Sequence, residues 1–424
     1  MRKIYGIFFL LIFINSSFSA CKETNPVQNK TKLDFLTKDI NKTTPSAFYN
    51  SILPALNACA NPVQRQALSD SIYYIALSKK WIPVVFADTA IFLYKHNSTA
   101  EAKIQVFGDL NGWSDTKSPQ ITLSNYSNTT LYFGIYKAPD TSTRVDYKLV
   151  VNGSWILDPG NPKLAWGGMG SNSELALSGY VYSEWVKERM NGNKGTLSDN
   201  IKIHSDSLKY DINYKVYLPF GYTSYVKYPV VFITDGQEYS DKNLGAVNIV
   251  ADNLIMDGEI KPVILIFIDP RDPVTGTNRR MKEYVNNRNF AHFLSTELYS
   301  QIKSNYSITG TANQTAILGT SLGGINSAYT GILHPDVFGL IAMQSPAFWY
   351  YPTVLDMYTT ADKAPLKIYM DAGTIYDTQE KASAMKAILD TRGYQLNYAE
   401  YSEGHSWGSW RARIDDILIY FFQK

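Results

Sequence analysis

The sequence predicts an α/β domain with a mostly parallel sheet, preceded by an all-β, immunoglobulin-like sandwich. Three observations lead to this prediction. Short alternating strands with turn residues between them run from Val84 to about Tyr182. From about Tyr214 onward, strand-like apolar runs alternate with segments of helical spacing, which is typical of a parallel sheet covered on both faces. Within that second part, Gly319-Thr320-Ser321-Leu322-Gly323 stands between a strand-like run and a helix-like run.

The length of 424 residues exceeds one ordinary domain. We divide the chain into residues 1–20, 21–82, 83–185 and 186–424. The net charge of +2 comes without a block of like charges, so the composition does not favour nucleic-acid binding. The sequence has no H-x-x-H motif and no cysteine cluster, and we expect neither a metal nor a cofactor.

Residues 1–20 have the pattern of an export signal. Arg2 and Lys3 precede the apolar run Ile4 to Ile14, which is too short to span a bilayer comfortably. The following Phe18-Ser19-Ala20-Cys21 looks like a bacterial lipobox. We therefore expect an exported protein that is anchored to the bacterial cell envelope, at the outer membrane or cell surface, through a lipid on Cys21. Cys59, the other of the two cysteines, would then be a lone buried thiol.

Residues 21–82 begin with a polar tether and continue with apolar residues at helical spacing. Phe48, Ile52 and Leu56 form one such set, and Leu68 and Ile72 belong to the next. We expect one or two small helices that pack on the following domain.

Residues 83–185 alternate between strands and turns. The strand-like runs are 90–94, 103–107, 131–136 and 145–151. The dipeptides Gly108-Asp109, Asn111-Gly112 and Asn152-Gly153 are turn signals between them. This spacing predicts the β-sandwich.

Residues 186–424 begin with a polar linker, 188–195, and then alternate between strands and helices. The expected elements are strands 214–218, 230–234, 263–269, 315–318, 366–370 and 395–401 and helices 244–255, 290–305, 322–333, 378–392 and 410–422. The short turn between 315–318 and 322–333 carries Ser321 in a G-x-S-x-G sequence. This is the nucleophile elbow of α/β-hydrolases, in which glycines let the backbone adopt a strained turn that projects the serine hydroxyl above the sheet. The sequence thus predicts an α/β-hydrolase domain with Ser321 as the nucleophile.

The histidine partner follows by elimination. In this fold the order along the chain is serine, acid, histidine, so only His334 and His405 of the five histidines remain. His334 precedes a proline at the end of the elbow helix, whereas His405 follows the last strand, where the fold places its base. We therefore predict His405.

Three carboxylates could orient His405. Asp371, Asp377 and Glu380 all follow the strand 366–370. Asp377 lies beyond a glycine turn and just before a helix, and we favour it; Asp371 and Glu380 stay open as alternatives.

Several motifs of residues 210–424 resemble the esterase family of α/β-hydrolases that includes enterochelin (ferric-siderophore) esterases and the feruloyl and acetylxylan esterases of carbohydrate esterase family one. The motifs are Thr234-Asp235-Gly236-Gln237, Arg280-Met281-Lys282-Glu283-Tyr284, the serine elbow, His334 to Gly339, Gln344 to Trp349 and Gly404-His405-Ser406-Trp407. The D-G-Q turn is closer to the enterochelin-esterase branch.

The resemblance implies a serine carboxylic ester hydrolase. The oxyanion hole would combine the amide of Leu322, the residue after the nucleophile, with the backbone of Gln237. Arg280, Glu283 and Trp407 would lie on the substrate side. The substrate would be a siderophore trilactone or, alternatively, a feruloyl or acetyl ester of a plant polysaccharide.

The middle of the chain is similar to the glycogen-binding family of carbohydrate-binding modules. Val106 to Ser114 and Asp146 to Pro159 carry this likeness. It implies sugar contacts through Trp113, Lys148 and Trp155, since indole faces suit the C–H surfaces of sugars. A further alternative for the whole protein is therefore a glycan-binding surface lipoprotein without catalysis.

Overall fold

The computed structural model describes residues 44–126, 128–168 and 170–424. The signal pattern of residues 1–20, the start of the tether and Cys21 lie outside the described residues. The chain forms two units, which we treat separately. The sandwich unit comprises the chain up to Ala165 together with Gly170–Val181, and unit 2 comprises Trp166–Met169 and Tyr182–Lys424. Among the described residues, no helix combines the length and the hydropathy that crossing a bilayer requires.

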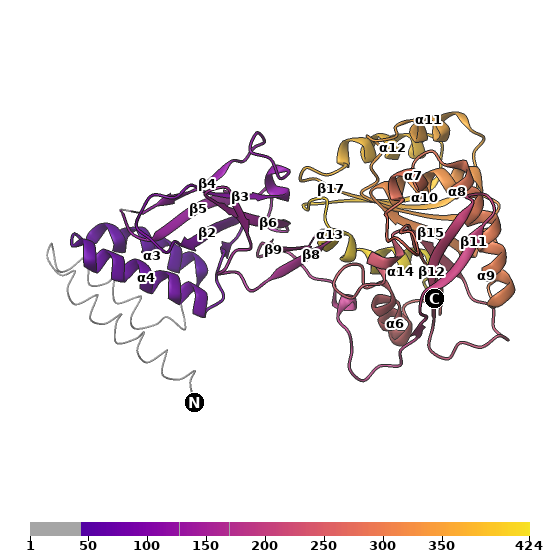
Figure 1. Ribbon diagram of the computed structural model, residues 1–424, viewed down its shortest axis with the longest axis horizontal. Coiled ribbons are helices and arrows are strands. Elements are labelled where there is room, and N and C mark those ends of the chain that lie inside the picture. Colours follow the sequence, from indigo (N-terminus) through magenta and orange to yellow (C-terminus); the bar gives the residue numbers. More distant parts are fainter. Residues whose placement is uncertain (1–43, 127, 169) are drawn as a thin grey trace. The chain divides into compact units, whose positions relative to one another are not determined.

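The sandwich unit begins with two helices whose apolar faces pack on its strands (Figure 1). Helix α3 is Pro45–Ala58 and α4 is Pro62–Ser78, each with proline in its first turn. The side chains of Thr44 and Asn61 accept hydrogen bonds from the first free N–H groups of these helices. The apolar spacing of the sequence predicted both helices.

The strands of this unit form an antiparallel arrangement in the order β1-β2-β5-β4-β3-β6-β9-β8, with β7 on β6. Their bounds are β1 Val84–Phe86, β2 Thr89–Lys95, β3 Ile104–Gly108, β4 Ile121–Asn125, β5 Leu131–Lys137, β6 Arg144–Val151, β7 Ser154–Ile156, β8 Leu164–Gly167 and β9 Gly170–Ala176. A 3-10 turn, Asp109–Asn111, follows β3. The all-β character of this region agrees with the prediction, and the immunoglobulin-like topology stays a prediction.

Cys59 lies at the end of α3 with no exposed surface, and its sulfur is in a disulfide. The expectation of a lone thiol is therefore wrong. The sequence contains only one other cysteine, Cys21.

Unit 2 is built on a sheet of order β10-β12-β14-β13-β15-β16-β17-β18, with β11 on β12. The strands are β10 Thr196–Leu197, β11 Ile201–Ser205, β12 Tyr210–Leu218, β13 Val230–Ile233, β14 Ile264–Asp269, β15 Thr315–Thr320, β16 Leu340–Gln344, β17 Lys367–Gly373 and β18 Gln395–Tyr401. From β14 to β18 all neighbours are parallel, and β10, β11 and β12 are antiparallel. The mostly parallel sheet agrees with the prediction, although β10, β11 and β16 are not among the strands expected by residue range.

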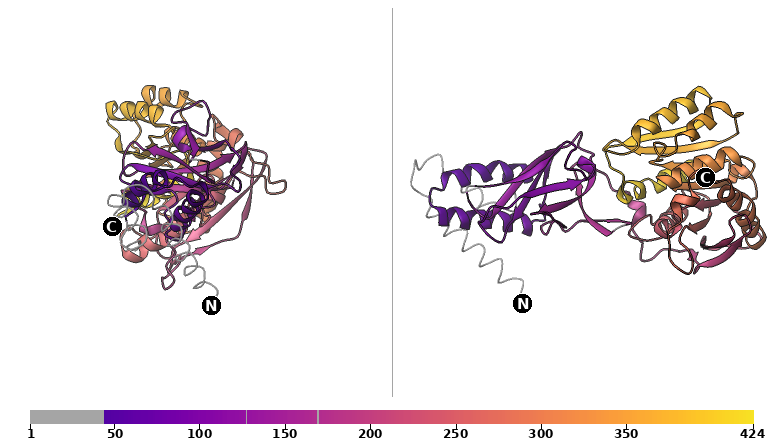
Figure 2. Two further views of the ribbon diagram at one scale, coloured as in Figure 1. Left: turned by 90° about the vertical axis from the view of Figure 1, so that its left-hand side faces the viewer. Right: turned by 45° about the horizontal axis from the view of Figure 1, so that its top comes forward.

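Helices cover both faces of this sheet. The helices are α5 Gly236–Tyr239, α6 Val247–Asp257, α7 Arg280–Glu283, α8 Arg288–His292, a π-helix Phe293–Leu298, α9 Tyr299–Asn305, α10 Leu322–Leu333, α11 Thr353–Thr360, α12 Gln379–Thr391, α13 Trp407–Arg411 and α14 Ile414–Phe422. Figures 1 and 2 show α11 and α12 on one side of the sheet and α6 and α14 on the other.

The strand residues alternate between two buried cores. In β13, Val230 and Phe232 pack in the core that contains α8 to α12, whereas Val231 and Ile233 pack in the core of α6, α13 and α14. Period-two alternation with apolar residues on both faces explains why the strand runs are continuously apolar. The sheet is therefore rigid, and polar residues concentrate in the loops at the carboxyl ends of its parallel strands.

Candidate active site

Ser321 occupies a strained turn between β15 and α10. Its φ of 57° and ψ of −115° are outside the usual regions for a residue with a side chain. Gly319 and Gly323 allow this turn, since a Cβ on Gly319 would lie 2.4 Å from the Gly323 backbone. A main-chain hydrogen bond fixes the serine to the end of the neighbouring strand β16: the Ser321 N–H donates to the carbonyl of Gln344 at 2.9 Å. The local sequence thus predicted the elbow correctly.

The loops after β17 and β18 bring two side chains to this serine. His405 Nε2 lies 2.9 Å from Ser321 Oγ, and His405 Nδ1 lies 2.5 Å from Asp377 Oδ1. The imidazole is about one-third exposed, whereas the Asp377 side chain has no exposed surface. This serine–histidine–carboxylate chain can move a proton from the hydroxyl to Nε2 while the carboxylate holds the other ring nitrogen.

The other oxygen of Asp377 is also held. Oδ2 accepts hydrogen bonds from Ser345 Oγ and from the Gly373 N–H, both at 2.6 Å. Ser345 Oγ in turn accepts from Trp410 Nε1 at 2.9 Å. The Trp410 ring also meets the His405 ring edge to face at 4.9 Å. Sequence reasoning missed Ser345 and Trp410, although Ser345 follows β16 in the motif Gln344-Ser345-Pro346.

The two alternative carboxylates do not reach His405. Asp371 is buried and faces the Ser345 N–H at 3.3 Å and Gln344 Nε2 at 3.4 Å; burial raises its pKa to about 7. Glu380 is 88% exposed and pairs with Lys381. Of the three candidates, Asp377 has the geometry of the triad acid.

His334 takes no part in this arrangement. It follows the last turn of α10, where its N–H donates to the carbonyl of Thr330 at 2.8 Å. Burial lowers the pKa of its imidazole. The elimination of His334 on its sequence context agrees with this placement.

The two predicted oxyanion donors lie at the starts of helices that follow the neighbouring strands β13 and β15. Leu322 opens α10 directly after Ser321, and Gln237 lies in α5 after β13, which pairs in parallel with β15. Within the described part of the chain, neither main-chain N–H has a hydrogen-bond partner in the structure. Free N–H groups at helix starts are the donors that an oxyanion needs.

The three predicted substrate-side residues differ in their setting. Arg280 is a quarter exposed and its guanidinium pairs with Asp235. Glu283 has no exposed surface and accepts a hydrogen bond from the Tyr210 hydroxyl at 3.0 Å. Trp407 is 5% exposed, and its Nε1 donates to Glu238 at 3.0 Å. Glu283 and Trp407 therefore offer almost no surface to a ligand in this conformation, and their substrate contacts stay a prediction.

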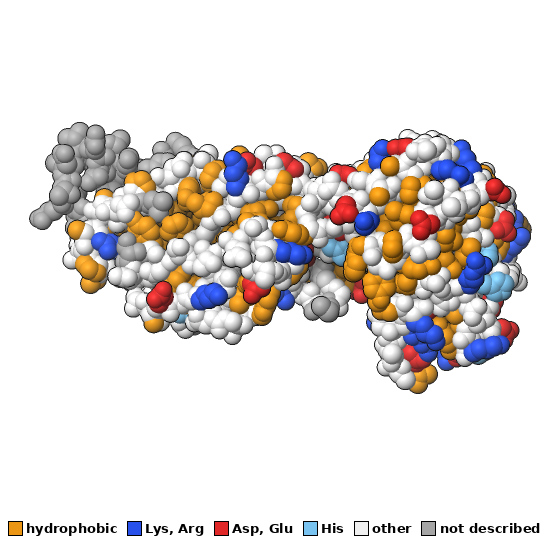
Figure 3. Space-filling model, turned by 90° about the horizontal axis from the view of Figure 1, so that it is seen from above, with side chains coloured by type: hydrophobic (Ala, Val, Ile, Leu, Met, Phe, Trp, Pro, Cys, Tyr) orange, Lys and Arg blue, Asp and Glu red, His pale blue; other side chains and the backbone are white. Residues whose placement is uncertain are grey.

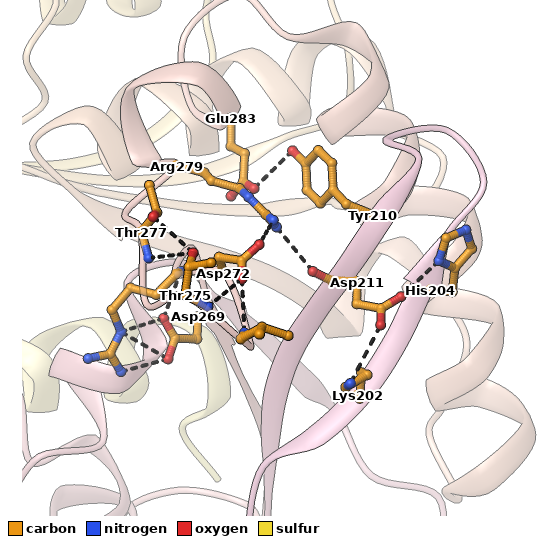
Figure 4. Close-up of polar contacts among 12 residues, drawn as sticks. Lys202, His204, Tyr210, Asp211, Asp269, Asp272, Thr275, Thr277, Arg279 and Glu283 are labelled. Carbon is orange, nitrogen blue, oxygen red and sulfur yellow. Dashed lines mark hydrogen bonds and ion pairs between the residues drawn. The ribbon is translucent and has the colours of Figure 1, made fainter.

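A polar cluster behind the loop after β14 explains the burial of Glu283. Figure 4 shows the Tyr210 hydroxyl pointing at Glu283, and Arg279 between Asp272 and the backbone of Asp211. The Arg279 guanidinium also stacks on the Tyr210 ring at 4.0 Å. Burial raises the pKa of Glu283 to about 7. These contacts hold the loop, and through it the short helix α7, against β12.

Large aromatic side chains are exposed on the loops after β16 and β17. Trp349 is 63% exposed, Tyr350 44% and Tyr376 46%. The loop that carries Trp349 is hydrogen-bonded to the backbone of the nucleophile, because the Ala347 N–H donates to the main-chain carbonyl of Ser321 at 3.0 Å. Figure 3 shows hydrophobic side chains gathered on one face of unit 2. The loops beside Ser321 therefore offer apolar surface to a ligand.

The sandwich unit carries an exposed aromatic pair of its own. The rings of Trp113 and Trp155 stack at 6.3 Å with 24° between their planes, and they are 37% and 52% exposed. Trp113 Nε1 donates to the buried carboxylate of Asp109 at 2.9 Å, and burial raises the pKa of Asp109 to about 7. Lys148 lies opposite Phe107 in the β3–β6 register, and Phe107 packs on Trp155. The three residues predicted from the module resemblance thus share a neighbourhood.

Comparison with known proteins agrees with this geometry. The family model described as "Putative esterase" matches residues 205–421, about half of the chain. The chain belongs to this esterase family. It adopts the α/β-hydrolase fold of its relatives, and the esterase assignment covers unit 2. Within the described residues, no group of three or more His, Cys, Asp or Glu side chains is arranged to hold a metal ion.

Two relatives and one solved structure illustrate the family. The esterase is 25% identical over 207 residues to the iron(III) enterobactin esterase of Dickeya dadantii, which covers 44% of this chain and 46% of that protein. It is 24% identical over 295 residues to the endo-1,4-beta-xylanase/feruloyl esterase of Xylanibacter ruminicola, covering 65% of this chain and 38% of that one. The chain thus spans less than half the length of these two relatives.

The crystal structure of the ferric enterobactin esterase from Salmonella typhimurium superposes with a TM-score of 0.67 at 18% identity. The match covers 78% of this esterase and 93% of that chain. At this level of identity the likeness concerns the fold.

Proposed function

We propose that this esterase is a serine carboxylesterase that acts through an acyl-enzyme. The contact between Ser321 Oγ and His405 Nε2 at 2.9 Å carries this proposal. His405 takes the hydroxyl proton as Ser321 attacks the ester carbonyl, and it then returns the proton to the leaving alcohol. A water molecule, activated by the same imidazole, hydrolyses the acyl-enzyme.

The negative charge that develops on the carbonyl oxygen needs hydrogen-bond donors that point at this oxygen. The N–H groups of Leu322 and Gln237 are free for this role, and each such donor contributes roughly 3 kcal/mol to lowering the barrier. Asp377, held by Ser345 and Gly373, keeps the imidazole in the tautomer that accepts the serine proton.

The substrate that we favour is an enterochelin-type siderophore trilactone. The D-G-Q turn and the enterobactin esterase relatives support it. The second candidate is a feruloyl or acetyl ester on plant polysaccharide, which the feruloyl esterase relative supports. The exposed Trp349, Tyr350 and Tyr376 suit the aromatic rings of a catecholate trilactone or of a feruloyl group.

One substrate panel tests both readings. The purified mature chain is assayed with p-nitrophenyl acetate, methyl ferulate and a ferric catecholate trilactone, beside its Ser321→Ala variant. We expect Ser321-dependent hydrolysis of all three, with the highest kcat/KM for the trilactone. A preference for methyl ferulate would favour the polysaccharide ester, and no hydrolysis at all would favour the non-catalytic glycan-binding alternative.

Glycan binding by the sandwich unit is a separate proposal. The exposed, nearly parallel rings of Trp113 and Trp155, with Lys148 nearby, support it because exposed indole faces suit the C–H surfaces of a sugar chain. In affinity electrophoresis through glucan or xylan gels, Trp113→Ala and Trp155→Ala should migrate faster than the parent. Tyr225→Ala, at an aromatic residue that is 96% exposed in unit 2, is the matched control. Equal migration of all forms would remove the proposal.

We also propose that the protein is exported and anchored at the bacterial cell envelope. The signal pattern supports export, because the basic Arg2 and Lys3 precede an apolar run and Phe18-Ser19-Ala20-Cys21. The lipid on Cys21 requires a sulfur free of any disulfide. If Cys21 carries the lipid, Cys21→Ser should move the protein from the membrane fraction to the soluble one. Unchanged fractionation, or an unlipidated mass for the mature N-terminus, would refute the anchor.

A further inference from the structure

The turn that carries Gln237 is held in an unfavourable conformation. Asp235 has φ 53° and ψ 37°, the left-handed region that residues with side chains rarely adopt. The next residue, Gly236, packs so closely on β14 that a Cβ would lie 2.3 Å from the Phe267 carbonyl carbon. A turn of this kind persists only where neighbouring groups hold it. The position of the Gln237 N–H therefore depends on what binds Asp235.

One face of the segment around α7 holds Asp235 by both its side chain and its backbone. Arg280 Nε lies 2.9 Å from each carboxylate oxygen of Asp235. Tyr284, four residues after Arg280, accepts a hydrogen bond through its hydroxyl from the main-chain N–H of Asp235 at 2.8 Å. Asp235 is 2% exposed, and burial raises the pKa of its carboxyl, an effect that the guanidinium opposes.

The same guanidinium reaches the other half of the oxyanion hole. Arg280 Nη2 donates to the main-chain carbonyl of Thr320 at 3.1 Å. Thr320 directly precedes Ser321, and Leu322 directly follows it. A single planar group thus binds the turn that presents the Gln237 N–H and the strand end that presents the Leu322 N–H.

We propose that Arg280 is a positioning residue that sets the two backbone donors of the oxyanion hole relative to each other. The inference rests on the proposed serine esterase function. Arg280 acts through Asp235 and Thr320 rather than through the substrate. Lysine cannot replace it, because an ammonium is a point charge without the planar fork that binds a carboxylate and a carbonyl together.

Kinetics on a small neutral ester test this role. With p-nitrophenyl acetate, Arg280→Ala and Arg280→Lys should lower kcat by about 100-fold, the size of effect seen when one oxyanion donor is lost. KM should change by less than about threefold, since ground-state binding is unaffected. The rate of labelling by an organophosphonate should fall in parallel. Arg189→Ala, which removes a guanidinium with a similar bidentate bond to Asp257 on the surface, is the matched control and should retain parental kinetics.

Chemical rescue separates positioning from a general structural effect. Guanidinium ion at millimolar concentration should raise the kcat of Arg280→Ala by about tenfold or more. It should leave the kcat of Arg280→Lys unchanged, because the lysine side chain fills the site. Because Arg280→Ala leaves a buried carboxylate unpaired, the double variant Arg280→Ala/Asp235→Asn provides a form without that charge. It should fold, show the same loss of kcat and resist rescue, since the partner of the guanidinium is gone.

Other outcomes overturn the inference. A KM increase that is confined to the larger trilactone, with parental kcat on p-nitrophenyl acetate, would make Arg280 a substrate-binding residue instead. Parental kcat in the well-folded double variant would also refute the positioning role. Failure of the proposed function is distinguishable, because it would appear as a parent protein that hydrolyses no ester.

Discussion

Asp377 Oδ1 lies 2.5 Å from Nδ1 of His405, although 28 residues separate them in the chain. The two side chains come from the loops after β17 and β18, which are parallel neighbours in the sheet. Their meeting point therefore follows from the sheet order, and the fully covered carboxylate has no competing contact with water.

Asp377→Asn should keep the fold and lower turnover by up to ~10⁴-fold, because an amide disfavours the productive imidazole tautomer. Asp371→Asn and Glu380→Gln are the matched comparisons, and each should cost less than about tenfold. Turnover is compared at equal folded fraction, measured by circular dichroism. A deeper loss in either comparison variant than in Asp377→Asn would reject Asp377 as the acid.

Ser321→Ala should abolish both ester hydrolysis and covalent labelling by an organophosphonate, since no oxygen remains to form the covalent bond. Intact mass spectrometry after incubation with the reagent measures the labelling. Ser327, buried one and a half turns later in α10, provides a control: Ser327→Ala should label at the parental rate. Persistent labelling of Ser321→Ala would place the nucleophile elsewhere.

Ser345→Ala should reduce kcat by about tenfold with little change in KM. The Ser345 hydroxyl donates to Asp377 Oδ2 at 2.6 Å, and a hydrogen bond to a charged group contributes roughly 1.5–3 kcal/mol. The loss should appear for acetyl and feruloyl esters alike, because Ser345 acts on the carboxylate. A substrate-dependent KM effect would instead mean that Ser345 contacts the substrate.

The buried carboxyl of Asp371 should make stability depend on pH. Burial raises its pKa from 3.8 to about 7 in the folded state, so the folded protein binds a proton that the unfolded chain has already lost. Stability from this group therefore falls as the pH rises from about 4 to about 7, with a slope of roughly 1.4 kcal/mol per pH unit. Asp371→Asn resembles the protonated form and removes this slope. Urea unfolding at pH 5 and pH 8 measures it, and equal slopes in parent and variant would contradict the prediction.

Local sequence was sufficient for the features that depend on a few adjacent residues. The strand, glycines and helix around Ser321 predict the elbow, because its strained backbone needs small residues on both sides. The order of nucleophile, acid and base along the chain left His334 and His405, and the proline after His334 favoured His405 as the base. Continuous apolar runs at 230–233 and 315–318 predict buried parallel strands, because both faces of such strands are covered.

Sequence patterns could not distinguish residues whose roles depend on the approach of distant segments. Arg280 and Glu283 belong to one short motif, yet Arg280 turns toward Asp235 and Glu283 toward Tyr210. Trp407 follows His405 by two residues, yet its ring packs in a buried core and its Nε1 donates to Glu238. The direction in which each of these side chains points depends on which side of a short helix faces the sheet. The spacing of apolar residues over only four or five positions does not determine that side.

By itself, then, the sequence determined the α/β architecture, the serine elbow and the histidine, since each follows from local backbone constraints or from chain order. Only the tertiary structure decided among Asp371, Asp377 and Glu380, and it revealed Ser345, Trp410 and the contacts of Arg280 with Asp235 and Thr320. The physical reason is that a hydrogen bond requires its two atoms within about 3 Å. Whether loops from separate strands reach that distance is set by the order and register of the strands in the sheet.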